Sequence, residues 1–321
     1  MAGNTSSVYD VHVRARWSDS VFDISTFQSM ESALGCGGTS MNNLNHSKGF
    51  IQRCATGDHR LAACGFTMAL LILPLLLAWS LETRTVLDAN VWVKPIKFCV
   101  ALSVYALTLS FFASFLSDNY RQSRTYVLFT KLVLISIALE IIWLIYASAI
   151  GEASHFNNSH PILVPLYSLM GILATILTGM SLAVAWGYRH HVDSALTQPV
   201  RISIILGLVL TFVLTLTTAS YMASSDAQSH TVLAVGQTLA VATTTKVPFF
   251  GWSMQAGDLR VSHFFATHAL HAVPLIGWLV GKVLPGRSGV AIVALVAIAY
   301  AVFVGFTFLQ ALNGQPFLSY Y

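Results

Sequence analysis

The stretch LVLISIALEIIWLIYASAI, residues 132–150, is the clearest indication of how this chain folds. It is a continuous apolar run with one charged residue, Glu140, and it lacks the alternation typical of a barrel strand. A helix of about 20 apolar residues is long enough to cross the hydrocarbon of a bilayer. Only helices and closed barrels satisfy their backbone polar groups in lipid. The stretch therefore predicts a transmembrane helix.

Apolar runs of this kind recur along the chain, which is 55% hydrophobic and 9% charged. Soluble domains carry about 25% charged residues. The predicted fold is therefore all-α, a polytopic integral membrane protein with a seven-transmembrane-helix bundle over residues 61–312. The seven predicted spans are 61–81, 96–117, 126–150, 162–188, 200–222, 261–281 and 289–312.

The flanking segments differ from the bundle in composition. Residues 1–60 are rich in Ser, Asn and Gly and contain no signal-peptide core, so they are predicted to form a flexible N-terminal tail. Residues 313–321 form a short C-terminal tail. The connection 223–260 is long for a helical bundle and is typical of a lid or binding loop.

Basic residues predict the orientation of the bundle through the positive-inside rule. The connections after the second, fourth and sixth helices carry two basic residues each, whereas 151–161 and 313–321 carry none. We therefore expect a cytoplasmic N-terminus, an outward-facing 223–260 loop and a C-terminus outside. Five more basic residues precede the first helix: Arg14, Arg16, Lys48, Arg53 and Arg60.

The net charge of +4 is spread over the connections expected inside, so it indicates topology and no nucleic-acid partner. The expected partners are the lipid bilayer and a small-molecule ligand, and a homo-oligomer is left open. The four cysteines show no spacing typical of a cysteine metal site.

Three histidines in one predicted span are the least expected feature. With a rise of about 1.5 Å per residue, His268 lies roughly 10 Å and His271 roughly 15 Å below the outer surface, and His263 lies near it. Glu140 lies at about the depth of His271. Ionisable groups at such depth are costly, and each is a candidate functional residue. The simpler interpretation of Glu140 is an interhelical hydrogen bond.

Helical geometry separates the three rings. His268 and His271 point about 60° apart and could share one ion, whereas His263 needs a different partner. Neutral imidazole is the commonest metal ligand, and histidines of facing helices can hold haem iron. The predicted metal-site residues are His268, His271, Glu140, His263 and His155.

Other polar residues are expected to line the same outward-facing cavity. Lys94 and Lys97 lie at the outer end of the second span, where snorkelling to the lipid headgroups is the simpler explanation. Asp258 is interpreted as the acidic first residue of the sixth helix, favoured by the helix dipole. The predicted ligand-binding residues are Lys97, Lys94, Arg260, Asn157 and Trp252.

The segments WVKPIKF, GEASHFN and FGWSMQAGDLRVSHFFATHAL resemble the signature segments of an uncharacterised bacterial family of polytopic membrane proteins. The resemblance covers roughly residues 61–284 and implies a polytopic fold in a bacterial inner membrane, with no particular activity. Members of that family tend to carry Gln near the position of His271. The resemblance therefore favours Lys97, Glu140, His155, Arg260, His263 and His268 over His271.

Three functions are compatible with these residues, and whether the protein is an enzyme is left open. The first is binding of a transition metal or b-type haem for redox chemistry. The alternative is a proton-coupled transporter or a receptor for a small polar or anionic ligand. Against that alternative, the chain is expected to hold no inverted repeat and no matching pair of Gly/Pro-broken helices. A membrane-embedded metal-dependent hydrolase is the third, without the HxxxH spacing expected of it.

Overall fold

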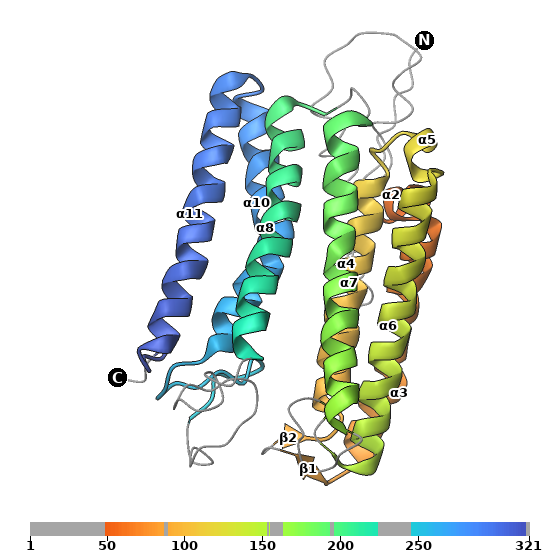
Figure 1. The fold of residues 1–321 in the computed structure, drawn as a ribbon, viewed down its shortest axis with the longest axis vertical. Coiled ribbons are helices and arrows are strands. Elements are labelled where there is room, and N and C mark those ends of the chain that lie inside the picture. The colour runs from red at the N-terminus through yellow and green to blue at the C-terminus, as the bar shows by residue number, and fades with distance from the viewer. Residues whose placement is uncertain are drawn as a thin grey trace, which may run out of the picture. The chain divides into compact units, whose positions relative to one another are not determined.

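The computed structural model describes residues 49–86, 89–152, 154, 163–192, 196–223 and 245–318 (Figure 1). In this part of the chain, seven helices are long and apolar enough to cross a membrane, which confirms the all-α seven-helix prediction and gives the architecture of a multi-pass membrane protein. These helices are α3 (His59–Leu81), α4 (Val93–Ala113), α6 (Arg124–Ile150), α7 (Leu163–His190), α8 (Gln198–Met222), α10 (Leu259–Val283) and α11 (Arg287–Leu312).

Shorter elements connect the long helices. The antiparallel strands β1 (Thr85–Val86) and β2 (Ala89–Asn90) join α3 to α4, and α5 (Asp118–Arg121) joins α4 to α6. One more helix, α2 (Phe50–Gly57), lies in the stretch expected to be a flexible tail. It buries Cys54 and Gly57 and packs on α4 and α3, so the region of regular structure begins before residue 60.

Consecutive long helices run in opposite directions (Figure 1). Gly57, just before α3, lies against Ser110 near the end of α4, and Gly257, just before α10, lies against Ala311 near the end of α11. We call the end of the bundle where α3 begins the Asp58 end, and the end where α10 begins the Asp258 end. The helices α3 and α10 therefore cross the bundle in opposite directions.

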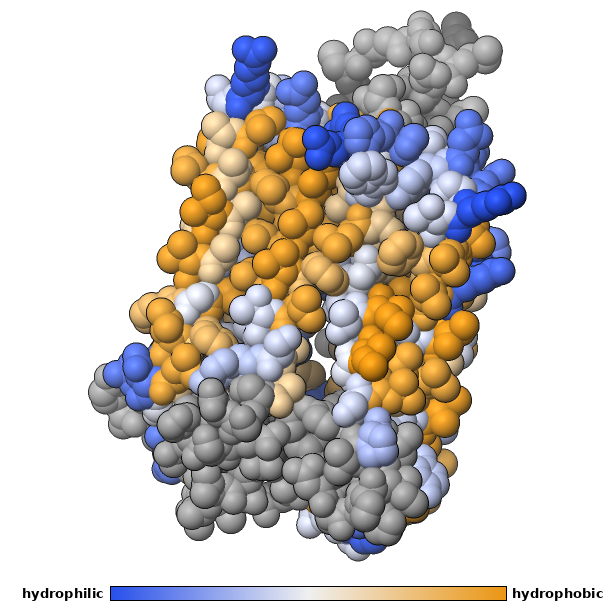
Figure 2. Space-filling model, in the orientation of Figure 1, coloured by the Kyte–Doolittle hydropathy of each residue, from blue (hydrophilic) through white to orange (hydrophobic). Residues whose placement is uncertain are grey.

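The helices pack mainly through neighbours in the chain. α3 packs on α4, α6 on α7, and α8 on α7, while α10 lies against both α8 and α11. Small residues permit close approach: a Cβ on Gly207 of α8 would lie 2.8 Å from the Pro274 ring of α10. The outward faces of α3 and α11 carry exposed leucine, valine, isoleucine and phenylalanine, and Figure 2 shows this apolar surface along the helices. Such a surface suits a hydrocarbon environment.

Candidate ligand and proton site

A turn at the Asp258 end receives cations from two helices. Its backbone closes through a hydrogen bond from Val247 N to Trp252 O. Lys97 of α4 donates from Nζ to the Phe250 carbonyl (3.2 Å), and Arg260 of α10 donates from Nη2 to the Gly251 carbonyl (2.8 Å). Two of the predicted ligand-binding residues therefore meet at adjacent carbonyls of one turn.

Asp258 holds Arg260 in this position. Its carboxylate caps α10, accepting from Arg260 N (3.0 Å) and Nε (2.8 Å), and it also accepts from Ser253 N (3.1 Å). The aspartate is 2% exposed. The expected acidic residue at this helix N-terminus is confirmed, and its ion pair with Arg260 is an additional finding.

Trp252 packs against the turn. The indole is buried, stacks on Phe250 with ring centroids 4.4 Å apart, and meets Phe264 of α10 edge to face. The next residue before Phe250, Phe249, has a positive φ of 66°, a strained backbone conformation for a phenylalanine. Aromatic packing therefore stabilises a turn whose backbone is strained.

The three histidines of α10 bind three different elements. His263 Nδ1 lies 3.0 Å from Thr218 Oγ1 of α8, and His271 Nε2 lies 3.1 Å from Thr108 Oγ1 of α4. His263 thus has a hydrogen-bond partner on α8, and His271 has one on α4, so α10 is hydrogen-bonded through imidazole to α8 and to α4.

His268 bonds within its own helix. Its Nδ1 lies 2.8 Å from the Phe264 carbonyl, and because a carbonyl only accepts, Nδ1 donates and Nε2 is left as an acceptor. The ring stacks on Phe264 at a centroid distance of 4.0 Å and lies 5.5 Å from the ring of His271. Nδ1 of His271 is buried without a hydrogen-bond partner in the described chain.

These positions bear on the predicted metal site. The two rings lie 5.5 Å apart, and a backbone carbonyl on one nitrogen, as His268 has, is the usual second contact of a ligating histidine. Within the described residues no group of three or more His, Cys, Asp and Glu is placed to hold a metal, so Glu140 does not join the two histidines in such a group. His155 and Asn157 lie outside the described residues.

Glu140 is buried in α6, with 3% of its surface exposed. Its Oε2 has no hydrogen-bond partner among the described residues. Lys94 of α4 is the cation that attracts it electrostatically. The two residues lie on α4 and α6 in the half of the bundle nearer the Asp258 end.

Further buried polar atoms lack partners in the described chain. They lie in the middle of three helices: Ser136 Oγ and Glu140 Oε2 on α6, Thr211 Oγ1 and Thr215 Oγ1 on α8, and His271 Nδ1 on α10. A buried polar group without a hydrogen bond is costly, so such a group calls for a water, ion or ligand as its partner. The interior of the bundle therefore holds binding capacity that its own side chains do not use.

The sequence around Asp258 also occurs around Asp58. GDHRLAACGFTMALLILPL, residues 57–75, and GDLRVSHFFATHALHAVPL, residues 257–275, share Gly, Asp, Arg, Thr, Ala, Leu, Pro and Leu at identical spacing. Both prolines, Pro74 and Pro274, lie inside their helices.

The shared residues build the same local structure twice. Each aspartate caps its helix and accepts from the backbone N of the arginine two residues on, at 3.0 Å in both copies. A Cβ on Gly57 would lie 1.9 Å from the Ser110 carbonyl oxygen, and one on Gly257 2.0 Å from that of Ala311. The chain therefore holds one motif twice, in helices of opposite direction, an arrangement that was not expected from the sequence. Both α3 and α10 are continuous through their prolines, so they are not a pair of Gly/Pro-broken helices.

The two copies differ at the histidines. Where α10 carries His263, His268 and His271, α3 carries Ala63, Met68 and Leu71. The packing of the shared motif thus does not require imidazole. The histidines are specific to the copy that begins at the Asp258 end, which favours a functional role for them.

Sequence reasoning did not find Thr108, Thr218 or the Asp58 copy of the motif. The signal for the last was present, because the motif recurs at a spacing of 200 residues. Comparison of the chain with models of known protein families, with curated proteins and with solved structures gives no match. The resemblance to an uncharacterised bacterial family stays a prediction.

Proposed function

We propose that this protein is a proton-coupled carrier of a small anion, with the Asp258 end facing outside. The inverted pair of α3 and α10, with Pro74 and Pro274 at matching positions, is the observation that carries this proposal. In secondary transporters, structural repeats of opposite direction flank the substrate site. Both α3 and α10 are continuous helices, and each loses one backbone hydrogen bond at its proline. A receptor of fixed conformation has no need of such a pair.

The charges at the Asp258 end favour an anion. Lys97 has three N–H donors, and Phe250 O is the acceptor it meets in the described chain. Arg260 is neutralised by Asp258, so Lys97 supplies the attraction and Arg260 orients the turn. A carboxylate or phosphate is the matching ligand.

The interior supplies the proton path. Glu140 and His271 each keep a buried polar atom without a partner in the described chain, Glu140 on α6, which packs on α4, and His271 on α10, which is hydrogen-bonded to Thr108 of α4. Carboxylates and imidazoles inside membranes commonly relay protons. Glu140 would take up the proton that accompanies the anion, with Lys94 as its counter-charge.

The proposed location is a bacterial inner membrane, with the N-terminus in the cytoplasm. The distribution of Lys and Arg supports this orientation, because the connections at the Asp58 end are the more basic ones.

Proton flux into vesicles tests the proposal. Purified protein is reconstituted into liposomes that enclose a pH-sensitive dye, and lactate, succinate or inorganic phosphate is added outside. We expect one of these anions to acidify the interior faster than in protein-free vesicles, and Glu140→Gln to abolish the difference. Glu82→Gln is the matched control, because Glu82 is a carboxylate outside the spans, paired with Arg84. If none of the three anions drives protons, or if Glu140→Gln keeps full flux, the proposal fails.

Binding of a transition metal is the second candidate, favoured by the 5.5 Å separation of the His268 and His271 rings. A bound metal would supply electron transfer, and the two histidines would share it. A b-type haem needs one axial ligand on each face of the porphyrin, so only one of these two histidines of α10 would hold it, with a partner on a facing helix. Elemental analysis and an absorption spectrum of protein purified without chelators test this candidate. A stoichiometric transition metal or a Soret band supports it, and the lack of both removes it.

A further inference from the structure

We propose that the two G-D-x-R motifs are the two gates of the carrier, with the Asp58 motif acting as a second functional site at the opposite end of the bundle. This inference rests on the proposed carrier function and adds the inner gate. The first step is to compare the Asp58 motif with the Asp258 motif.

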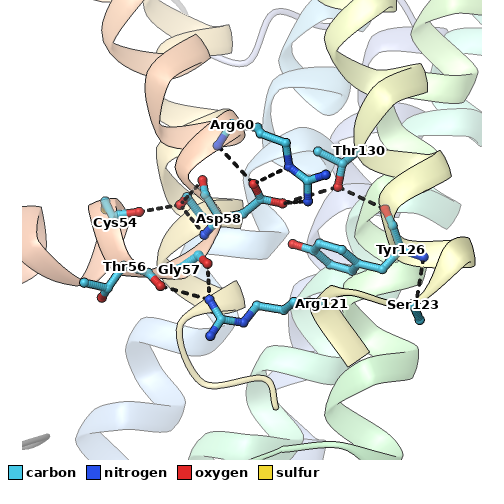
Figure 3. Close-up of polar contacts among 10 residues, drawn as sticks. Cys54, Thr56, Gly57, Asp58, Arg60, Arg121, Ser123, Tyr126 and Thr130 are labelled. Atoms are coloured by element: carbon cyan, nitrogen blue, oxygen red, sulfur yellow. Dashed lines mark hydrogen bonds and ion pairs between the residues drawn. The ribbon is translucent and has the colours of Figure 1, made fainter. Parts of the chain in front are cut away.

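Asp58 is held as firmly as Asp258. It is 3% exposed and accepts from Arg60 N (3.0 Å), Nε (2.9 Å) and Nη2 (2.8 Å), and Thr130 of α6 approaches Oδ2 at 3.4 Å (Figure 3). Burial alone would raise the pKa of this carboxyl. The hydrogen bonds and charge of Arg60 outweigh burial and hold the pKa below its usual value.

Neighbouring helices fasten the segment before α3. Ser110 of α4 donates from Oγ to the Asp58 carbonyl (2.9 Å) and accepts from Asp58 N (3.1 Å). Arg121 of α5 donates from Nη1 to the carbonyls of Thr56, at 2.9 Å, and Gly57 (Figure 3). The Asp58 end is thus held closed in three ways: Asp58 caps α3, Asp58 pairs with Arg60, and Arg121 donates to two backbone carbonyls.

The Asp258 end has the same plan. There, Lys97 and Arg260 bind the carbonyls of Phe250 and Gly251 in the segment that leads into α10. In both places a cation from a different helix, Arg121 or Lys97, fastens the backbone that precedes the motif. We call these two arrangements the Asp58 latch and the Asp258 latch.

One polar atom beside the Asp58 latch lacks a partner among the described residues. The Tyr126 hydroxyl is buried, points toward the segment of Gly57 and Asp58, and helps to hold the pKa of the Asp58 carboxyl below its usual value (Figure 3). Arg121 Nε, by contrast, is buried without a hydrogen-bond partner in the described chain. A buried donor in this state is consistent with a segment that rearranges or admits a ligand.

Because α3 and α10 run in opposite directions, the two latches lie at opposite ends of the bundle and have opposite roles. Each helix has a proline at the same distance from its aspartate, and a proline removes a helical hydrogen bond and permits bending. Bending α3 would release the Asp58 end, and bending α10 would release the Asp258 end. In alternating access, one end opens while the other stays closed.

A native thiol reports on the Asp58 latch. Cys54 of α2 is fully buried, its carbonyl accepts from Ser110 Oγ, and burial raises the pKa of its thiol to about 11. The reactive species is the thiolate, so Cys54 is inert while the latch is closed. At the other latch, Ser253→Cys places a thiol at a buried position beside Asp258.

The experiment measures thiol labelling by an impermeant maleimide in two single-cysteine proteins, one with Cys54 and one with Ser253→Cys. Asp58→Asn should raise the labelling rate of Cys54 by about tenfold, the effect of one charge-assisted hydrogen bond, and should lower that of Ser253→Cys. Asp258→Asn should do the reverse. Glu82→Gln should change neither labelling rate. Glu82 accepts hydrogen bonds from the arginine two residues on, as Asp58 and Asp258 do, but the Glu82–Arg84 pair is exposed.

Arg121→Gln and Lys97→Gln repeat the test without changing a buried aspartate, in case an Asp→Asn variant does not fold. The gate assignment would be overturned if the labelling rates of both thiols rose together, or if neither rate changed. Labelling needs no ligand, so it is independent of the flux assay. If protons are transported but the labelling rates of the two thiols do not change in opposite directions, the gate assignment is wrong and the carrier function stands. If the two labelling rates change in opposite directions but no proton flux is seen, the gate assignment stands and the proposed anion transport is wrong.

Discussion

Lys97 and Arg260 come from helices α4 and α10 and bind adjacent carbonyl oxygens, those of Phe250 and Gly251. Like charges are brought together only where backbone oxygens or an anion compensate them. Asp258 compensates Arg260, and Lys97 keeps the larger exposed surface. The turn is therefore the point at which the proposed anion would meet Lys97 and Arg260 together.

Replacing Lys97 by Met should weaken anion binding. The variant keeps the apolar stem and removes the ammonium, so we expect the half-saturating anion concentration in the flux assay to rise by about tenfold. Lys282→Met is the control, because Lys282 lies 3.5 Å over the Trp278 ring at the Asp58 end. An unchanged half-saturating concentration in Lys97→Met would show that Lys97 only fastens the turn.

The His→Ala variants of α10 should differ in the amount of metal or haem that they retain. His268→Ala removes the ring whose Nδ1 already donates to a carbonyl, and we expect it to lower the bound metal or haem most. His271→Ala should lower it less, and His263→Ala least, because His263 is bonded to Thr218. Metal content and the Soret absorbance of the purified variants measure this order. Full content in His268→Ala would move the site elsewhere, with His155 as the next candidate.

The two motif glycines should not tolerate an added Cβ. A Cβ on Gly57 or Gly257 would meet a backbone carbonyl at 2.0 Å or less, so α3 or α10 would have to shift. Overpacking of this kind costs about 1–3 kcal/mol. Gly305→Ala is the control, because a Cβ there meets nothing within 4 Å. Thermal unfolding in detergent measures the difference, and equal midpoints for Gly57→Ala and Gly305→Ala would contradict the packing described.

The seven spans could be predicted because a helix in lipid needs a continuous apolar run, which is visible in one sequence without knowledge of its neighbours. The short helix α2 was not predicted, because its apolar residues are few and its burial depends on contact with α4. Local composition therefore determines the long helices, and packing determines the short one.

The site was predicted only in part for a similar reason. Helical periodicity gives the direction of His263 and His271 around α10, but it does not say that Thr218 and Thr108 lie there to receive them. Equal depth suggested that Glu140 accompanies His271, yet depth does not specify which helices are adjacent. The α3 copy of the motif was overlooked because it lacks the histidines that drew attention to α10.

Cysteines at Ser194 and Ser225 test the orientation. Both positions lie outside the described residues, in connections that follow α7 and α8. From the positive-inside rule we expect Ser194→Cys to be protected and Ser225→Cys to be labelled when an impermeant maleimide is added to intact cells. The other cysteines are removed first, and lysed cells serve as the control in which both label. Equal labelling in intact cells would refute an outward-facing Asp258 end.

Acid should weaken the Asp58 latch only at low pH. Because Arg60 holds the pKa of Asp58 below its unfolded value, this carboxylate stabilises the fold above the ordinary pKa of an aspartate, and that stability is lost as pH falls through the lowered folded pKa. At pH 7, Asp58→Asn should therefore reduce the free energy of unfolding by about 2 kcal/mol, the effect of a hydrogen bond to a charged group. Below the ordinary aspartate range the difference from wild type should shrink. Thermal midpoints of both proteins in detergent between pH 7 and pH 3 measure this, and a difference that stays constant over that range would mean that the Asp58 charge does not stabilise the latch.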